Sequence, residues 1–175
     1  TPLSSSAASD VYKRQIRTQP QCVTSVVIQV MAKKILLIGG TSGVGREVLR
    51  SQRKLGNDVI CASRTNDGGM DLFGAEWQAF DATGSDSELN LPEVLDGLVY
   101  CPGSITLKPF ARLSDGDFQR DLEVNYLGCV RTIRQALPAL KRSKQASIVL
   151  FSTAAVQTGL PFHASISGAK GAIEG

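Results

Sequence analysis

Three glycines that follow a short apolar run carry the first chemical signal in this sequence. Residues 35–38 read ILLI, and Gly39, Gly43 and Gly45 follow in the spacing G-x-x-x-G-x-G. Because glycine has no Cβ atom, the backbone can turn tightly there and approach a ligand closely. A helix that begins at such a turn presents free N–H groups and the positive end of its dipole, which together bind phosphate. The pattern therefore predicts a dinucleotide site, with an ordinary glycine-rich loop as the alternative.

The elements that would position this turn alternate between strands and helices. Short apolar runs predict strands at residues 35–38, 58–63, 76–80, 97–101 and 147–152. The spacing of apolar residues predicts a helix over 44–55, a long helix after an N-cap at Ser114, and another helix from Ala164 onward. Residues 86–91 are predicted to form a short helix or a turn. This alternation predicts an α/β fold, a doubly wound parallel sheet of the Rossmann type with strand order 3-2-1-4-5, incomplete at its C-terminal end.

The same topology predicts where a ligand binds. In a parallel sheet covered by helices, ligands bind beyond the carboxyl ends of the strands. The loops expected at that edge are residues 39–45, 63–66, 81–83, 101–104 and 152–163. We expect these loops to converge on one site.

Length and composition exclude several classes of protein. The chain has 175 residues, 42% of them hydrophobic and 20% charged, and its mean hydropathy is close to zero, as expected for one globular domain. The net charge is only +3 and the basic residues are scattered, so we expect no nucleic-acid partner. The apolar segment 23–30 is too short to span a bilayer, so we expect no membrane association.

The cysteines and the single histidine argue against a metal site. Cys22, Cys61, Cys101 and Cys129 form no C-x-x-C pair, and His163 is the only histidine. A zinc site built from these residue types needs closer spacing. Cys61 and Cys101 fall in predicted strands, where a reduced thiol acts as a small apolar side chain. Reduced cysteines predict a cytoplasmic location.

Residues 1–30 differ from the rest of the chain. They are rich in serine, lack the periodicity of a helix or strand, and precede Met31, which is our expected natural start. The segment resembles linker sequence that is read as coding in translated environmental fragments. We therefore expect a disordered, non-native leader over 1–30 and one dinucleotide-binding domain over 31–175. A transit peptide is the alternative, because the segment is Ser-rich and basic.

From residue 33 to residue 175 the sequence resembles the first two thirds of a short-chain dehydrogenase/reductase. The glycine spacing matches the family's motif, and Asp81 follows the third predicted strand as the family's aspartate does. Gly103 keeps the glycine of the family's Asn-Asn-Ala-Gly motif, whose other positions hold Tyr100, Cys101 and Pro102 here. The resemblance implies a nicotinamide dinucleotide cofactor held by Gly39, Thr41, Ser42, Gly43, Val44, Gly45, Ser63, Arg64, Asp81, Ala82, Pro102, Gly103 and Lys170.

The resemblance also implies a catalytic group of Asn, Ser, Tyr and Lys. Asn125 and Lys170 occupy two of these positions, and Thr153 falls on the Ser position, where its hydroxyl would bind a substrate oxygen. The Tyr position, one helical turn before Lys170, is Ile166, which cannot exchange a proton. His163, one turn before Ile166, is the candidate proton donor, because imidazole titrates near neutral pH. A helix cap or a surface position is the alternative role of His163.

The residues after the second predicted strand indicate which cofactor binds. A carboxylate there would accept hydrogen bonds from the ribose hydroxyls and repel a 2′-phosphate, which favours NAD. This chain has Ser63 followed by Arg64, whose guanidinium suits a phosphate, and Arg46 adds positive charge. We therefore expect NADP, with NAD as the alternative.

Together these residues predict an NAD(P)-dependent oxidoreductase that transfers hydride between nicotinamide and a carbonyl or secondary alcohol of a small-molecule substrate. The alternative is a catalytically inactive dinucleotide-binding protein that acts as a sensor or a partner subunit, which Ile166 favours. In relatives the helices that bear the Asn and the Lys pack against another subunit, so we expect a homo-oligomer for the full-length protein.

Overall fold

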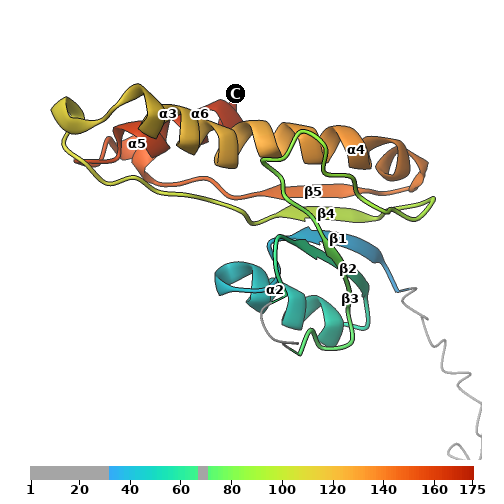
Figure 1. The fold of residues 1–175 in the computed structure, drawn as a ribbon. Helices are drawn as coiled ribbons and strands as arrows, with labels where there is room; N and C mark the ends of the chain where they lie inside the picture. The colour runs from blue at the N-terminus through green and yellow to red at the C-terminus, as the bar shows by residue number, and fades with distance from the viewer. Residues whose placement is uncertain (1–31, 67–70) are drawn as a thin grey trace, which may run out of the picture. The chain divides into compact units, whose positions relative to one another are not determined.

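The computed structural model describes residues 32–66 and 71–175, and within them five parallel strands form one sheet (Figure 1). The strand order is β3-β2-β1-β4-β5, which confirms the predicted order. The strands are β1 (Lys34–Ile38), β2 (Asp58–Ser63), β3 (Glu76–Ala79), β4 (Gly97–Tyr100) and β5 (Ser147–Leu150). The leader predicted over 1–30 lies outside the described residues, and so does Cys22.

Helices connect the strands, and the predicted helices near 44–55, after Ser114 and from Ala164 onward are confirmed. They are α2 (Gly43–Lys54), α3 (Asp115–Leu122) continued by α4 (Gly128–Arg142), and α6 (Ala164–Glu174). The sequence does not predict the short elements η1 (Phe110–Arg112), η2 (Glu123–Leu127) and α5 (Ala155–Thr158). The segment 86–91, predicted to be a short helix or a turn, is not a helix, and a turn at Ser85 and Asp86 overlaps its first residue.

Hydrophobic layers cover both faces of the sheet, with α2 on one face and α4 on the other (Figure 1). Along β1, Ile35 and Leu37 pack in one core with Leu49 of α2. Leu36 and Ile38 point to the opposite face and pack in the core that includes residues of α4. Because side chains alternate along a strand, a strand covered on both faces has to be apolar throughout. This is why β1 reads as a continuous apolar run.

One long helix runs from α3 through η2 to α4 and changes its hydrogen-bond pattern in the middle. η2 is a π-helical turn, a rare form in which the backbone bonds span one residue more than in an α-helix. Tyr100, at the end of β4, donates a hydrogen bond from its hydroxyl to the Val124 carbonyl oxygen at 2.7 Å. Gly128 leaves room for this contact, because a Cβ atom there would lie 2.6 Å from the Tyr100 hydroxyl oxygen. Apolar spacing alone does not reveal this turn.

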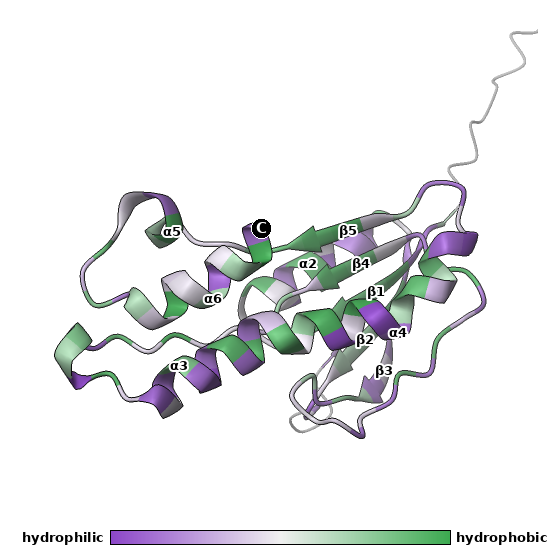
Figure 2. Ribbon diagram, turned by 90° about the horizontal axis from the view of Figure 1, so that it is seen from above, coloured by the Kyte–Doolittle hydropathy of each residue, from purple (hydrophilic) through white to green (hydrophobic). Residues whose placement is uncertain are grey.

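The strand β5 lies at one edge of the sheet and exposes apolar residues. Figure 2 shows strongly hydrophobic residues along β5 and its neighbour β4. Ile148 and Val149 of β5 are 43% and 46% exposed. The central strand β1, in contrast, is buried over nearly its whole length.

Candidate functional site

The glycine turn lies between β1 and α2 and holds a backbone shape that needs glycine. Gly39 and Gly43 have φ angles of +77° and +52°, in the left-handed region. A Cβ atom on Gly45 would overlap with the carbonyl oxygen of Gly39 and lie 3.2 Å from the Cα atom of Gly40. The N-cap residue Ser42 makes no side-chain capping hydrogen bond. The first turn of α2 therefore keeps free N–H groups that can bind an anion.

A cleft of about 640 Å³ opens beside this turn. Small-molecule sites in proteins have volumes of roughly 300–1,000 Å³. All the residues predicted to bind the cofactor, except Lys170, lie in its wall. The wall consists of Ile38, Gly39, Thr41, Ser42, Gly43, Val44, Gly45, Ser63, Arg64, Thr65, Phe80, Asp81, Ala82, Thr83, Tyr100, Cys101, Pro102, Gly103, Ser104 and Val124.

The loops after β1, β2, β3 and β4 converge on this cleft, as the topology predicts. The loop over 152–163 was expected to join them, but it contributes no residue to the wall that the described residues form. The reason lies in the strand order, because β5 is the edge strand beyond β4 and is separated by β4 from the glycine turn.

Ser63 and its neighbours are tied together at the end of β2. The Ser63 hydroxyl donates a hydrogen bond to the Thr65 carbonyl oxygen at 2.9 Å and accepts one from the Trp77 indole N–H at 2.9 Å. Ser63 thus fixes the start of the loop, and its hydroxyl hydrogen already takes part in the hydrogen bond to Thr65. The next residue, Arg64, is exposed and lies in the cleft wall.

Asp81 lines the same cleft as Arg64. Hydrogen bonds from the hydroxyl and the backbone N–H of Thr83, at 2.7 and 2.9 Å, hold the pKa of Asp81 below its ordinary value. Burial opposes this shift, and the positive charge of Arg64 adds a smaller lowering effect. The cleft therefore carries a fixed negative group after β3 and an exposed cation after β2.

Asn125 is fully buried in η2 and supports the loop after β4. Its Nδ2 group donates hydrogen bonds to the Asp121 carbonyl oxygen at 2.9 Å and to the Ser104 hydroxyl at 3.1 Å. Its Oδ1 atom has no hydrogen-bond partner among the described residues, and a Cβ atom on Gly103 would lie 3.3 Å from it. A buried acceptor without a partner beside the cleft is suited to a donor group of a bound ligand or a water.

Lys170 is buried in α6 near two thiols, those of Cys101 and Cys129. Burial lowers the pKa of Lys170 from its ordinary value. Burial also raises the pKa of Cys101 to about 11, Cys61 adds to this rise, and the Lys170 charge opposes it. Since Cys101 belongs to the cleft wall, Lys170 lies close to the cleft without being part of its wall. Cys61, Cys101 and Cys129 are all free thiols.

The other predicted catalytic residues lie around β5 and the start of α6. Ile166 is 4% exposed on α6, which packs against α3 and η2. The Thr153 hydroxyl oxygen accepts a hydrogen bond from the backbone N–H of Ala155 at 3.3 Å, so its own hydrogen remains available. His163 occupies the N-cap position of α6, and its ring Nδ1 lies 2.6 Å from the Pro161 carbonyl oxygen.

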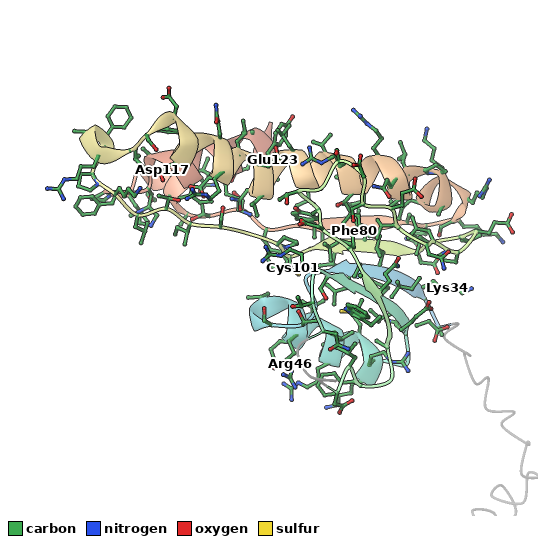
Figure 3. The ribbon with its side chains drawn as sticks, viewed as in Figure 1. Lys34, Arg46, Phe80, Cys101, Asp117 and Glu123 are labelled. Carbon is green, nitrogen blue, oxygen red and sulfur yellow. The ribbon has the colours of Figure 1, made fainter. Side chains whose placement is uncertain are left out.

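Asn125, Thr153, His163 and Lys170 therefore do not line the described cleft, and their catalytic roles stay predictions. Arg46, which was expected to add positive charge near the cofactor, lies outside the wall, with its guanidinium 5.9 Å from the ring centroid of Phe73 (Figure 3).

Sequence reasoning included Ser104 only as part of the loop 101–104 and did not select Val124, and both residues line the cleft. Position is the signal that could have found them, because Ser104 follows Gly103 and Val124 precedes Asn125. Neither residue has a type that predicts a ligand by itself.

Comparison with known proteins decides the family. The short chain dehydrogenase family matches this sequence over residues 33–175. The chain belongs to this family. The protein named "Uncharacterized oxidoreductase Rv1543" from Mycobacterium tuberculosis is 24% identical over 165 residues, which cover 83% of this chain and 48% of that protein. The bifunctional ribulose 5-phosphate reductase/CDP-ribitol pyrophosphorylase Bcs1 from Haemophilus influenzae is 27% identical over 142 residues, which cover 79% of this chain and 28% of that protein. The chain thus spans about half, or less, of the length of these curated relatives.

Solved structures share the fold. A short chain dehydrogenase/reductase family protein superimposes with a TM-score of 0.75 and 26% identity, over 81% of this chain and 64% of that chain. A short-chain dehydrogenase from Streptomyces avermitilis superimposes with a TM-score of 0.74 and 24% identity, over 82% of this chain and 57% of that chain. The α/β, Rossmann-like fold class predicted from the sequence is confirmed.

The family implies a nicotinamide dinucleotide, NAD or NADP, and the residues of this chain fit such a group. A Cβ atom at position 45 would clash with the backbone of the glycine turn, and the cleft has a suitable volume. Among the described residues, no three His, Cys, Asp or Glu side chains form a group that could hold a metal ion. Within that same part of the chain, no helix has the length and apolar character needed to cross a membrane.

Proposed function

We propose that this chain forms the cofactor-binding part of an NADP-dependent oxidoreductase that transfers hydride between nicotinamide and a carbonyl or secondary alcohol. The observation that carries the proposal is the cleft wall, which combines the glycine turn with an exposed cation at the end of β2. Membership of the short chain dehydrogenase family supports oxidoreductase chemistry with NAD or NADP.

Arg64 supports NADP over NAD. Its guanidinium is exposed in the cleft wall and forms no ion pair within residues 32–66 and 71–175. A guanidinium can donate two parallel hydrogen bonds to a phosphate, which a 2′-phosphate of NADP would accept. The position holds no carboxylate that would repel this phosphate, because Ser63 stands at the end of β2.

The remaining assignments follow the family. The first turn of α2, with Thr41 and Ser42, would bind the two linked phosphates, Asp81 would lie near the adenine, and Lys170 would hold a ribose. The Thr153 hydroxyl would bind the substrate oxygen. The nicotinamide, when bound, supplies or accepts the hydride.

Titration of the full-length protein with NADPH and NADH, followed by nucleotide fluorescence, tests the cofactor assignment. We expect NADPH to bind more tightly, and Arg64→Ala to weaken NADPH binding about tenfold or more, the size of a lost charge-assisted hydrogen bond, with NADH unchanged. Arg50→Ala is the matched control, because it removes the same charge from α2 outside the cleft wall. Equal affinities in the wild type would contradict the NADP preference, and binding of neither nucleotide would contradict the proposed function.

Turnover is tested by following NADPH absorbance with a panel of aldehydes, ketones and quinones. We expect at least one of these carbonyl compounds to be reduced. Tight NADPH binding without turnover across the panel would favour a second candidate, a dinucleotide-binding protein without catalysis.

The presence of Ile166 favours this second candidate, because a buried isoleucine occupies the position at which the family has its catalytic Tyr. Ile166→Tyr would place a phenol one turn before Lys170 on the same helix face. Turnover gained by Ile166→Tyr and not by Ile166→Phe, which lacks the hydroxyl, would show that the chain had kept the cofactor site and lost only the acid. Turnover in the wild type would exclude the second candidate.

A further inference from the structure

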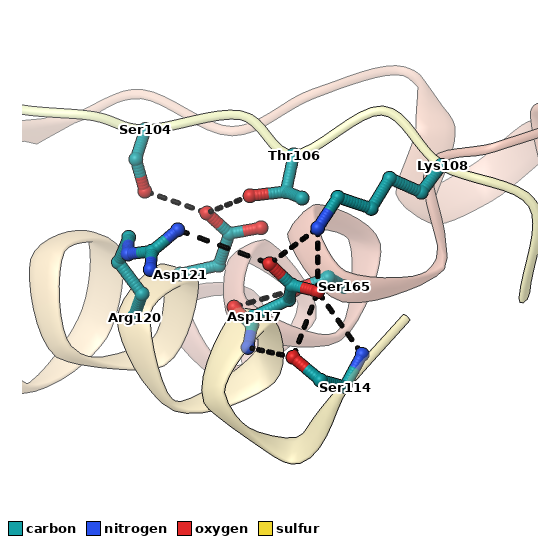
Figure 4. A network of polar contacts seen from close by, with 8 residues as sticks. All are labelled: Ser104, Thr106, Lys108, Ser114, Asp117, Arg120, Asp121 and Ser165. Carbon is teal, nitrogen blue, oxygen red and sulfur yellow. Dashed lines mark hydrogen bonds and ion pairs between the residues drawn. The ribbon is translucent and has the colours of Figure 1, made fainter. Parts of the chain in front are cut away.

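A buried carboxyl group, Asp121, lies beside the site and has no role in the chemistry described above (Figure 4). Asp121 is 0% exposed and belongs to α3, one helical turn before Asn125. Its Oδ1 atom accepts hydrogen bonds from the Ser104 hydroxyl at 2.7 Å and from the Thr106 hydroxyl at 3.4 Å. Its Oδ2 atom has no hydrogen-bond partner among the described residues.

Asp121 differs from Asp117, the other buried aspartate of α3. Asp117 forms ion pairs with Lys108, Nζ to Oδ2 at 2.8 Å, and with Arg120, Nη1 to Oδ1 at 3.8 Å. In the described part of the chain no basic side chain forms an ion pair with Asp121. Burial of a carboxyl group away from water and away from a cation is costly for stability alone. The hydroxyl groups that contact Asp121 both donate and accept, so they can pass a proton to or from it.

Several charged or titratable side chains lie on the elements that pack around Asp121, and none of them forms an ion pair with it in the described structure. They include Asp117, Arg120 and Glu123 on its own long helix, Lys108 on the loop after β4, and His163, Lys170 and Glu174 on α6. All but Lys170 form a hydrogen bond or an ion pair with a group other than Asp121. The direct polar contacts of the Asp121 carboxyl group are therefore the hydroxyl groups of Ser104 and Thr106.

Ser104 joins this carboxyl group to the cleft. Ser104 belongs to the cleft wall, and its hydroxyl donates directly to Asp121 Oδ1. The helix α6, which carries Ile166, packs against α3, and the Ser165 hydroxyl donates to the Asp117 carbonyl oxygen at 3.2 Å. Asp121 thus lies on α3, which packs against α6, the helix that has Ile166 in place of the family's Tyr. The Ser104 hydroxyl connects Asp121 to the cleft wall.

We propose that Asp121 and Ser104 form a proton relay that replaces the phenol missing at position 166. The relay rests on the proposed oxidoreductase function, in which the nicotinamide supplies the hydride. During reduction the Ser104 hydroxyl gives its proton to the substrate oxygen, so that its O–H bond breaks as the O–H bond of the alcohol forms. The Asp121 carboxyl group then returns a proton to the Ser104 oxygen and becomes a carboxylate. Oxidation of an alcohol runs the same transfers in reverse.

Variants of the full-length protein separate the relay from a structural role. Asp121→Asn keeps the shape and the Oδ1 acceptor but cannot exchange the acidic proton. Ser104→Ala removes the hydroxyl, and Ser104→Thr restores one. Asp117→Asn is the matched control, because it changes the other buried aspartate of α3, which contacts no residue of the cleft wall. Circular dichroism verifies folding, and Ser104→Ala carries the test if Asp121→Asn does not fold.

We expect Asp121→Asn and Ser104→Ala to lower kcat for carbonyl reduction about 100-fold or more, the size of a lost general acid, with NADPH affinity unchanged in Asp121→Asn, which lies outside the cleft wall. Ser104→Thr should recover most of the loss. Asp121→Asn should change the pH profile of kcat, and Asp117→Asn should keep the wild-type profile.

Infrared spectroscopy gives a readout that needs no turnover. A protonated carboxyl group absorbs apart from carboxylates, so the relay predicts an infrared band of the protein that disappears in Asp121→Asn, shifts in Ser104→Ala and persists in Asp117→Asn. Wild-type turnover with unaffected variants, or the absence of a band that depends on Asp121, would overturn the relay alone. A wild type that reduces no substrate would overturn the oxidoreductase proposal and the relay with it.

Discussion

Gly45 determines how closely α2 approaches β1 at the cleft. A Cβ atom there would overlap with the Gly39 carbonyl oxygen and lie 2.9 Å from the carbonyl carbon. These are backbone atoms, which cannot rotate aside as a flexible side chain can, so Gly45→Ala has to push the start of α2 away from the sheet. We expect NADPH affinity to fall about tenfold or more and the free energy of unfolding to fall by about 1–3 kcal/mol, as in other overpacked sites. Fluorescence titration and urea unfolding measure the two effects.

Gly168→Ala is the matched control for this change. Gly168 lies inside α6, and a Cβ atom there would meet no atom within 4 Å. Alanine stabilises a helix interior over glycine by up to about 1 kcal/mol, so this variant should bind NADPH normally and be at least as stable as the wild type. If Gly45→Ala behaved like Gly168→Ala in both measurements, the steric explanation of the glycine turn would be wrong.

At the scale of elements, the π-helical turn η2 depends on a contact from β4. The Tyr100 hydroxyl donates to the Val124 carbonyl oxygen, and burial raises the pKa of Tyr100, so the hydroxyl remains a donor at neutral pH. Tyr100→Phe keeps the buried ring and leaves the carbonyl without this partner. We expect the free energy of unfolding, measured with urea, to fall by about 1–3 kcal/mol. Tyr126→Phe changes a tyrosine of the same turn whose hydroxyl has no hydrogen bond in the described structure, and it should cost less than about 0.5 kcal/mol. Equal losses in the two variants would contradict this role of Tyr100.

The start of α3 is held by Asp117, and this contact makes stability depend on pH. Hydrogen bonds from Lys108 and from the backbone and hydroxyl of Ser114 hold the pKa of Asp117 well below its ordinary value of 3.8. Because the pKa is lower in the folded chain than in the unfolded chain, the stabilisation is complete above about pH 4 and is lost as the pH falls below that value. We expect Asp117→Asn to be less stable at neutral pH and to lose less stability between about pH 4 and pH 2 than the wild type.

Urea unfolding over a series of pH values measures this dependence. Asp115→Asn is the control, because Asp115 lies in the same first turn of α3, is exposed and forms no ion pair in the described structure. It should follow the wild-type pH dependence. A wild-type slope that Asp117→Asn leaves unchanged would show that another group is responsible for the acid sensitivity.

The sequence predicts the long elements of this fold because their buried faces require apolar residues at regular positions, and this spacing is visible in the sequence. The run at 35–38 is apolar throughout because β1 is covered on both faces, and Ser114 marks the start of α3 by its capping hydrogen bond. The short elements leave no such pattern. α5 has only four residues and ends at Gly159 in the left-handed conformation, and η2 depends on the contact with Tyr100. Periodicity within one segment cannot report a contact with another.

The candidate site likewise has one part that the sequence could predict and one part that it could not. The wall of the cleft could be predicted, because Gly45 and its neighbours form a local motif whose spacing follows from the turn itself. The hydrogen bond between Ser104 and Asp121 could not, because it joins residues 17 positions apart on different elements. An aspartate inside a predicted helix reads as a solvated residue, and only the fold shows that Asp121 is buried.

At the scale of the whole molecule, the cleft is a product of the sheet rather than of one segment. Residues that line it follow β1, β2, β3 and β4, and Val124 reaches it from the long helix that packs on β4. Each loop is held by a strand in the same parallel register, so the wall forms only when the sheet is complete. A ligand that contacts this wall interacts with the folded state of the whole domain and not with any isolated part of it.

Binding of NADPH should therefore raise the melting temperature of the domain as a single transition. A ligand that binds only the folded state adds about 2.7 kcal/mol at a concentration one hundred times its Kd. For a domain of this size that gain corresponds to a rise of roughly 5–10 °C, which thermal unfolding followed by circular dichroism would measure. NADH at the same concentration should give a smaller rise, because it lacks the phosphate that Arg64 is proposed to bind. Gly45→Ala should lose most of the shift with NADPH, whereas Gly168→Ala should keep it. A shift of wild-type size in Gly45→Ala would mean that the cofactor binds somewhere other than this cleft.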